Sequence, residues 1–154
     1  MDNHHYFEEI EIPNMPSCLI FLDIDGTLIP DAPEECFLEN IVIGKVTQLS
    51  KHHTVYLCTN GKDRNRAQSI ASRLGITLVE SKHKKYSRKI LNDLPLDQNR
   101  QTLVIGDKIL TDGLLAKRLQ AHLYLVKRKY SGKERLLVRL SNYLDDVVTV
   151  TIFP

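Results

Sequence analysis

Acidic side chains follow an apolar segment near the start of this sequence, at the end of a predicted strand, where they could take part in chemistry. The segment from Cys18 to Asp23, CLIFLD, is apolar up to its last residue, which is typical of a strand buried on both faces of a parallel sheet. Asp23 closes this strand, and Asp25 follows two residues later. Because ligands of open α/β sheets bind at the carboxyl ends of the strands, the two acids indicate a functional site.

The residues after Asp25 favour a tight loop. Gly26 permits a sharp turn, and Thr27 supplies a hydroxyl that can hold the loop in place. A strand followed by a simple turn would explain the same D-x-D-G pattern without any chemistry. The interpretation as a site therefore depends on the rest of the chain.

Two further apolar segments end in polar residues. TVYLCTN ends in Thr59 and Asn60, and QTLVIGD ends in Asp107, with Asp112 five residues further on. A lysine-rich turn, KHKK, lies between these segments. Parallel strands would bring all these side chains to one edge of the sheet. Carboxylates from two strands suit Mg²⁺, which prefers oxygen ligands, while a hydroxyl and an ammonium suit the oxygens of a phosphoryl group.

Predicted strands and helices alternate along the chain, and this alternation indicates a parallel sheet with helices on both faces. The strands are predicted at 18–23, 54–60, 76–80, 101–107 and 123–126, and the helices at 35–50, 64–74, 86–94, 112–119 and 132–144. The expected fold is a three-layer α/β/α, Rossmann-like domain. It comprises a core at about 17–127 and extensions at 1–16 and 128–154.

The two ends of the chain carry strand-like patterns. YFEEIEI at 6–12 and VVTVTIFP at 147–154 both alternate, and neither has another obvious partner. We therefore expect the two segments to form strands that pair with each other or across a dimer.

The composition is that of an ordinary globular domain: 154 residues, 42% hydrophobic, with a formal charge of +2. The sequence lacks a long apolar run, and its N-terminus is polar and acidic, so a cytoplasmic protein is expected. Cys18, Cys36 and Cys58 are odd in number and widely spaced, which favours buried thiols over a disulfide or a zinc site. The small charge and the 6% aromatic content argue against a nucleic-acid partner.

Taken together, four segments resemble the motifs of the haloacid dehalogenase (HAD) superfamily. LDIDGTLIP resembles the first motif, CTNG the second, the lysine of KHKK the third and IGDKILTD the fourth, in the same order. The resemblance covers about Leu19 to Val126. Within it, GDKILTDGLLAKRLQAHLYLV is similar to a group of small phosphatases that includes phosphatidylglycerophosphate phosphatases. The resemblance implies a Mg²⁺-dependent phosphomonoesterase without a cap domain.

The resemblance also implies roles for the four acids. Asp23 would attack phosphorus and form an aspartyl-phosphate, and Asp25 would protonate the leaving oxygen and later activate water. Mg²⁺ would be held by Asp23, Asp107 and the backbone carbonyl of Asp25, while Asp112 would orient the waters of the metal.

The resemblance implies contacts to the phosphoryl group as well. Thr59 would donate a hydrogen bond to it, and Lys84 aligns best with the motif lysine, although Lys82 and Lys85 are close alternatives. Asn60 fits a loop-shaping role as well as a substrate contact. The candidates for further phosphate or substrate binding are Gly26, Asn60 and Lys85.

The short intervals between the motifs leave no room for a cap domain, so we expect an open site. A neighbouring subunit of a homo-oligomer would cover such a site, or a large substrate such as a lipid head group at a membrane would cover it on binding. The basic residues in 82–89 would favour an anionic membrane, and a phosphatidylglycerophosphate-like substrate is the leading expectation. The alternatives are a soluble sugar phosphate, a nucleic-acid 3′ end, and a module that binds phosphate without catalysis.

Overall fold

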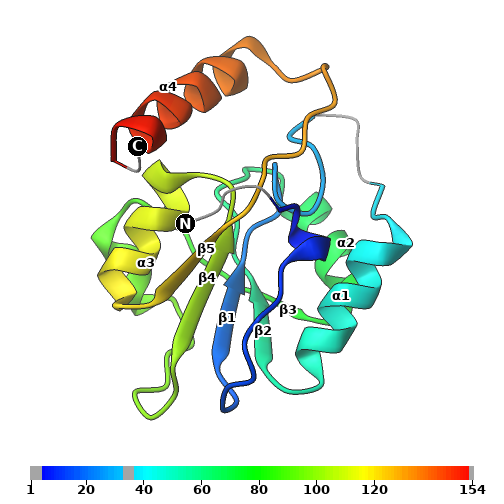
Figure 1. The fold of residues 1–154 in the computed structure, drawn as a ribbon, viewed down its shortest axis with the longest axis vertical. Helices are drawn as coiled ribbons and strands as arrows, with labels where there is room; N and C mark the ends of the chain where they lie inside the picture. The colour runs from blue at the N-terminus through cyan, green and yellow to red at the C-terminus, as the bar shows by residue number, and fades with distance from the viewer. Residues whose placement is uncertain (1–4, 33–36, 153–154) are drawn as a thin grey trace.

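A five-stranded sheet forms the centre of the computed structural model, which describes residues 5–32 and 37–152. All its strands are parallel, in the order β3-β2-β1-β4-β5 (Figure 1). The strands are β1 (Leu19–Leu22), β2 (Thr54–Leu57), β3 (Thr77–Leu78), β4 (Thr102–Gly106) and β5 (His122–Leu125). The predicted α/β fold with a parallel sheet is confirmed. Most strands are shorter than predicted because the polar residues that follow them already belong to loops.

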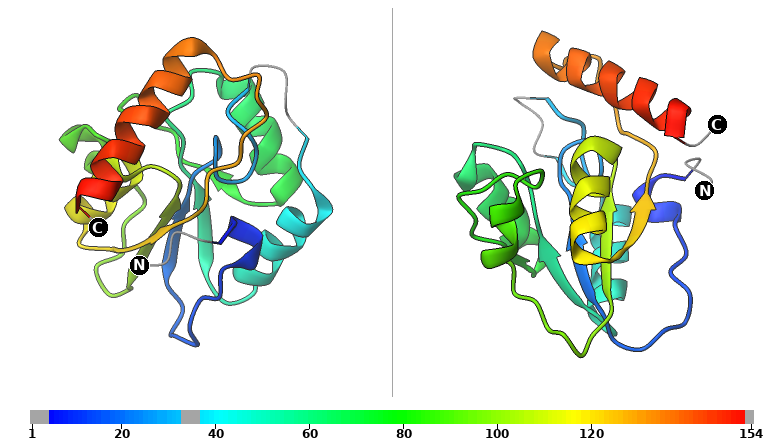
Figure 2. Two further views of the ribbon diagram at one scale, coloured as in Figure 1. Left: turned by 45° about the horizontal axis from the view of Figure 1, so that its top comes forward. Right: turned by 90° about the vertical axis from the view of Figure 1, so that its left-hand side faces the viewer.

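Helices cover both faces of the sheet (Figure 2). Helices α1 (Asn40–Ser50) and α2 (Arg64–Leu74) lie on one face, and the short 3-10 helix η2 (Arg88–Asn92) and α3 (Leu114–Leu119) lie on the other. Successive residues of β1 point to opposite faces: Ile20 and Leu22 enter the first core, and Phe21 enters the second. This double coverage explains why β1 is apolar without interruption.

The register of the sheet aligns the three strand ends that were expected to carry chemistry. Leu22, the last residue of β1, is paired with Leu57 of β2 on one side and with Ile105 of β4 on the other. The residues that follow these three positions therefore emerge side by side at the carboxyl edge of the sheet.

Helix α2 was predicted with the correct boundaries, because both of its ends carry clear signals. Asp63 accepts a hydrogen bond from the backbone N–H of Arg66 at 2.9 Å, which caps the first turn. Gly75 ends the helix in a left-handed conformation with φ of 67°.

Helix α1 differs from its prediction. It begins at Asn40, and residues 35 and 36 lie outside the described part of the chain. Leu38 and Val42 are buried as expected, but Phe37 and Ile41, predicted on the same buried face, are 76% and 59% exposed.

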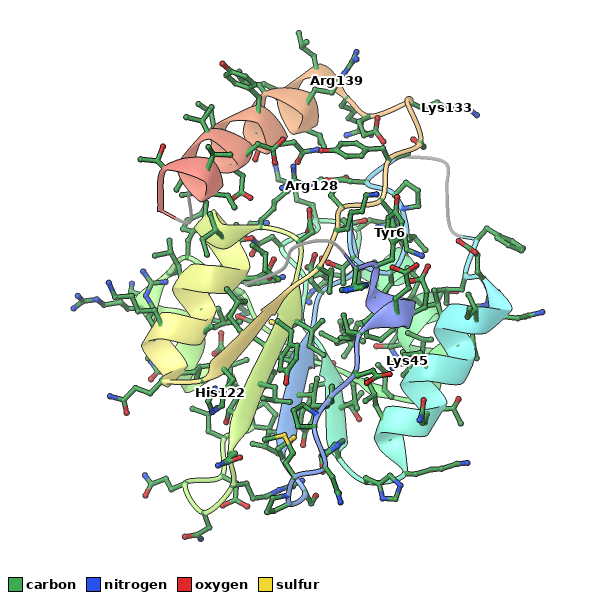
Figure 3. The ribbon with its side chains drawn as sticks, in the orientation of Figure 1. Tyr6, Lys45, His122, Arg128, Lys133 and Arg139 are labelled. Carbon is green, nitrogen blue, oxygen red and sulfur yellow. The ribbon has the colours of Figure 1, made fainter. Side chains whose placement is uncertain are left out.

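The predicted N-terminal strand is wrong. Part of the 6–12 segment forms a single 3-10 turn, η1 (Phe7–Glu9), which buries Phe7 and Ile10. Their three-residue spacing fits this turn and not the two-residue period of a strand. The ammonium of Lys45 on α1 donates to the backbone carbonyl of Ile10 and holds the segment against the domain (Figure 3).

The predicted C-terminal strand is also wrong. Residues 147–152 continue helix α4 (Leu136–Ile152), and residues 153 and 154 lie outside the described chain. The hydroxyls of Thr149 and Thr151 each donate to the carbonyl four residues earlier, so these β-branched residues are satisfied within a helix. The predicted pairing of the two ends as strands is therefore wrong as well.

Three other helices also have boundaries that differ from the predictions. The helix expected at 86–94 is reduced to η2. The one expected at 112–119 begins earlier, with a π-helical turn η3 (Ile109–Gly113) before α3. The helix expected at 132–144 is α4, which begins at Leu136 and extends much further.

Helix α4 crosses over the carboxyl edge of the sheet (Figures 1 and 2). Within residues 5–32 and 37–152 the segments between the strands form only the helices and loops described above. None of the described helices is long and apolar enough to span a membrane. Cys18 and Cys58 are buried free thiols, and Cys36 lies outside the described residues.

Candidate active site

Three aspartates form a buried cluster at the carboxyl edge of the sheet. Asp23 directly follows β1, Asp107 directly follows β4, and Asp112 lies in η3. The side chains are almost fully buried, and one carboxylate oxygen from each lies within 4.8 Å of the others. The structure therefore brings together three of the four acids predicted for the site.

The lysine in this cluster is Lys85, and its side chain is only 1% exposed. Its ammonium donates to Oδ1 of Asp23 and, at 2.6 Å, to Oδ1 of Asp112. Lys84, which aligned best with the family spacing, instead donates to the backbone carbonyl of Asn60. The geometry thus favours Lys85 over Lys84 and Lys82 as the lysine that acts beside Asp23.

Burial raises the pKa of each clustered carboxyl group to about 6. The Lys85 ammonium opposes this shift for Asp23 and Asp112, whereas the charge of Asp112 adds to it for Asp107. Burial alone would lower the pKa of Lys85, but Asp112 and Asp23 outweigh burial and raise it. The lysine therefore stays charged, and its charge helps to keep the acids close together.

Two glycines allow the carboxylates to approach the backbone. Gly26 has φ of 86°, and a Cβ at this position would lie 2.5 Å from Oδ2 of Asp107. A Cβ at Gly106 would overlap the carboxyl group of Asp112. Thr27 ties the loop down as expected, since its hydroxyl lies 3.3 Å from Oδ2 of Asp23 and 3.4 Å from Oδ1 of Asp107.

Asp25 lies beside the cluster and is bound by an arginine that the sequence interpretation missed. Its Oδ1 is 2.7 Å from the guanidinium of Arg66, and both side chains are about 15% exposed. Arg66 belongs to the first turn of α2, and this turn starts at the same edge of the sheet. The position of Arg66 shortly after the second predicted strand could have indicated that it lies at the site.

Thr59 and Asn60 occupy the loop after β2 and have different roles. The hydroxyl of Thr59 accepts a hydrogen bond from the backbone N–H of Gly61 at 2.9 Å, and Thr59 lines the pocket above Asp23. The side-chain oxygen of Asn60 accepts from the backbone N–H of Lys85 at 2.8 Å. Asn60 therefore shapes the loop that carries Lys85, which was one of its two predicted roles.

Arg128 is a second arginine that the sequence interpretation did not identify. Its Nε donates to Oδ2 of Asp107 at 2.5 Å, and another nitrogen reaches the carbonyl of the same residue at 3.1 Å. The guanidinium also contacts Asp145 at 3.1 Å and Asp146 at 2.8 Å, both on α4. Figure 3 shows Arg128 between α4 and the sheet. It lies just after β5, so the strand-end argument applied elsewhere would have found it.

Helix α4 partly covers the site. Asp145 accepts hydrogen bonds from the backbone N–H groups of Ile109 and Leu110, at 3.2 and 2.8 Å, and so fixes the turn that leads to Asp112. Ser141 of the same helix lines the pocket, which has a volume of about 320 Å³. The site is therefore more enclosed than the open edge predicted from the sequence.

The donor set of the cluster can hold a metal ion. Three carboxylates offer hard oxygen atoms, and Arg128 contacts Oδ2 of Asp107 without contacting Oδ1. Lys85 and Arg128 bring two positive charges against three negative ones, so the cluster retains negative charge that attracts a cation.

Comparison with known proteins gives a similarity of fold. No family model matches the chain, and no curated protein matches its sequence. The structure is similar to a chain of the Pnkp1/Rnl/Hen1 complex, with a TM-score of 0.52 and 10% sequence identity. The match covers 84% of this chain but only 53% of that chain. At this identity the similarity shows a shared α/β fold.

Proposed function

We propose that this protein is a HAD-type phosphatase that hydrolyses phosphomonoesters with Mg²⁺ through an aspartyl-phosphate on Asp23. The contact between Asp23 and the buried Lys85 ammonium, within the three-carboxylate cluster, carries the proposal. In support of the proposal, the Asp23 oxygen lies beside a buried positive charge and within the candidate metal cluster, and Asp23 lines a pocket.

In the first half of the reaction, an oxygen of Asp23 attacks phosphorus. The new bond to Asp23 forms as the bond from phosphorus to the ester oxygen breaks, and Asp25 gives its proton to that oxygen. The alcohol leaves. In the second half, Asp25 takes a proton from water, the resulting hydroxide attacks phosphorus, and the bond to Asp23 breaks to release inorganic phosphate.

The neighbouring side chains hold these groups in place. Arg66 orients Asp25 toward the pocket through its 2.7 Å ion pair. Lys85 fixes one oxygen of Asp23 and brings positive charge to the phosphoryl group, and Thr59 offers its hydroxyl from the loop after β2. Asn60 acts indirectly by fixing the backbone of Lys85.

Asp23, Asp107 and Asp112 would hold Mg²⁺, together with the backbone carbonyl of Asp25. When bound, the metal supplies charge neutralisation for the transferring phosphoryl group. Arg128 would restrict the orientation of the Asp107 carboxylate in this role, because its Nε donates to Oδ2 of Asp107.

The pocket suits a phosphate on a small organic group. Its volume is about 320 Å³, and its walls include Lys84, Tyr86, Lys108 and Ser141. We propose a substrate of this size with further hydroxyl or anionic groups for the two lysines to bind. A phosphatidylglycerophosphate-like head group and a soluble sugar phosphate share this chemistry, and a substrate panel separates them.

Phosphate release from such a panel tests the proposal directly. The panel contains sugar phosphates, nucleotides with 3′-phosphates, and phosphatidylglycerophosphate in mixed micelles, each with and without Mg²⁺. We expect Mg²⁺-dependent release that Asp23→Asn reduces by about 10³-fold or more. Asp97→Asn, an exposed acid away from the site, is the matched control and should retain full activity. Activity of Asp23→Asn within about tenfold of the unmutated protein would remove Asp23 from the role of nucleophile.

Thermal unfolding tests the metal site without an activity assay. Mg²⁺ that binds only the folded protein should raise the melting temperature, by an amount equivalent to about 2.7 kcal/mol at 100 times its dissociation constant. Asp107→Asn should lose most of this response. If Mg²⁺ has no effect and no ester is hydrolysed, a module that binds phosphate without catalysis is the better description.

A further inference from the structure

Helix α4 buries polar side chains against the domain and leaves most of its apolar side chains exposed to solvent. Asn142 and Asp145 are buried, and Thr149 is half-buried on the same side. The opposite side, called here the outer face, carries seven apolar residues that are between 47% and 80% exposed. The outer face consists of Leu136, Leu137, Leu140, Tyr143, Leu144, Val147 and Val150.

This arrangement is the reverse of the usual one. A helix on the surface of a globular domain normally buries its apolar stripe and exposes its polar side. A continuous apolar stripe along a whole helix is the kind of surface that binds a partner.

The spacing of the outer face is that of a coiled-coil helix. Leu136, Leu140, Tyr143, Val147 and Val150 recur at alternating intervals of four and three residues. Such spacing lets the side chains of one helix pack between those of another along a straight line of contact. The stripe therefore fits another helix.

Charged residues border this stripe on one side only. Leu137 and Leu144 widen the stripe on one flank, whereas Arg139 and Asp146 form the other flank, seven residues apart. Asp146 contacts Arg128 through Oδ1 and remains 58% exposed. Figure 3 shows Arg139 at the side of α4 that is turned away from the sheet.

We propose that the outer face of α4 pairs with α4 of a second copy of this chain, antiparallel and about a two-fold axis. In an antiparallel pair the same flanks of the two helices meet. Arg139 near one end then lies beside Asp146 of the partner subunit, and the contact occurs twice. A parallel pair would set the charged flank against Leu137 and Leu144, so neither Arg139 nor Asp146 would meet an opposite charge of the partner subunit.

The charges of α4 favour a protein partner over a lipid surface. A helix that lies on a membrane usually carries lysines and arginines along its polar side. Here the polar side is already occupied by the helix's own domain, and α4 contains one base, Arg139, against two acids, Asp145 and Asp146. The helix itself therefore has no net positive charge that would attract anionic lipid.

Pairing through the outer face leaves the site contacts of α4 in place. Ser141 and Asp145 project to the inner side, toward the pocket and the η3 turn. A dimer would therefore hold α4 over the site in both copies. This proposal does not depend on the catalytic one, because the pairing would exist whatever the site does.

Sedimentation of the full chain at a series of concentrations is the first test. We expect a species of twice the 17.7 kDa of one chain, which dissociates on dilution between about 1 and 100 µM. The Leu140→Asp/Val147→Asp variant should weaken this dimer by about 100-fold or more while its circular dichroism stays native. Ile41→Asp is the matched control, since Ile41 is an equally exposed apolar residue on α1, and it should leave the dimer unchanged.

A charge exchange tests the orientation. Arg139→Asp and Asp146→Arg should each weaken self-association, because each places like charges together in an antiparallel dimer. Mixing the two variants should restore dimers, since opposite charges then meet at both positions. A parallel dimer would show no such rescue.

Two results would overturn the proposal. One is a protein that stays monomeric at every concentration tested. The other is a monomer that binds phosphatidylglycerol vesicles through α4, shown by loss of binding in Leu140→Asp/Val147→Asp but not in Ile41→Asp. In that case the outer face would be a lipid-binding surface.

Discussion

Helices α2 and α4 both flank the candidate site, but they attach to the domain in opposite ways. Helix α2 buries Ala67, Ile70, Ala71 and Leu74 and exposes its polar side. Helix α4 buries polar side chains, and Arg128 and the η3 turn hold it through hydrogen bonds and ion pairs. The comparison teaches that apolar spacing identifies a helix without telling which side faces the domain.

Different substitutions should therefore disrupt the attachment of α2 and the attachment of α4. Apolar burial fixes α2 as part of the central core, so damage there should destabilise the whole domain. Charge and hydrogen bonding fix α4, so damage there should release one helix and leave the sheet intact. The following predictions test this difference.

The largest expected effect is the loss of packing under α2. Ile70→Ala removes a side chain that is 1% exposed, and we expect the free energy of unfolding to fall by about 4 kcal/mol. Urea unfolding followed by circular dichroism measures this change. Gln68→Ala, at an exposed position of the same helix, should change stability by less than about 0.5 kcal/mol. Equal effects from the two variants would mean that α2 is not fixed by its apolar face.

Arg128→Met should have a smaller and more local effect. It leaves buried Asp107 and Asp145 without their cation, which should cost about 3 kcal/mol. Because α4 can detach, we expect fast amide hydrogen exchange in 136–152 and slow exchange in the strands. The proposed phosphatase activity should fall too, since Asp107 loses the arginine that holds its carboxylate.

Lys127→Met is the control for the Arg128 experiment. Lys127 precedes Arg128 but is exposed, with its ammonium 4.8 Å from the centre of the Tyr6 ring. The Lys127→Met variant should leave amide hydrogen exchange in α4 unchanged. Uniform loss of protection across the sheet in Arg128→Met would show that α4 belongs to the same cooperative unit as α2.

Removal of the N-terminal cap of α2 should cost about 1 kcal/mol. Asp63→Ala deletes the carboxylate that accepts from the Arg66 N–H at 2.9 Å. Because Arg66 lies in the same turn and contacts Asp25, we expect a modest decrease in the kcat of the proposed hydrolysis along with the lower urea midpoint. Asp63→Ser, which can also cap, should restore most of both quantities.

The smallest effect is expected at the exposed end of the Arg128 network. Asp146→Asn should change stability by about 0.5 kcal/mol, because Asp146 is 58% exposed and water screens the pair. The measurement is best made in the Leu140→Asp/Val147→Asp background, in which α4 pairing does not contribute. A loss as large as that of Arg128→Met would mean that the outer ion pair, and not the buried one, holds α4.

The central sheet could be predicted from sequence because its strands are buried on both faces. A short apolar run such as the one before Asp23 fits few structures other than a buried strand. Helix α2 could also be predicted because it carries capping residues at both ends. The same argument placed Asp23 and Asp107 at neighbouring strand ends, where the structure has them.

The rest of the site could not be predicted from the sequence, because tertiary contacts determine it. Which lysine of KHKK enters the cluster is decided by the loop around Asn60, whose side chain fixes the backbone of Lys85 and not that of Lys84. The C-terminal residues were mistaken for a strand because β-branched residues favour strands, but the helix that begins at Leu136 continues through them. Arg66 and Arg128 lie near strand ends, which the sequence could have shown, but only the structure reveals their partners Asp25 and Asp107.

The central position of β1 determines when a newly made chain can complete its sheet. Leu19 pairs with Thr54 of β2 on one side and with Thr102 of β4 on the other. One edge of β1 can therefore pair only after β4, which is translated much later, has been made. Until β4 emerges, one hydrogen-bonding edge of this fully apolar strand has no neighbour, and Asp23 stands without the two acids that surround it in the finished fold. Helix α4 follows all five strands along the chain, so it can cover the pocket only after every strand of the sheet has been made.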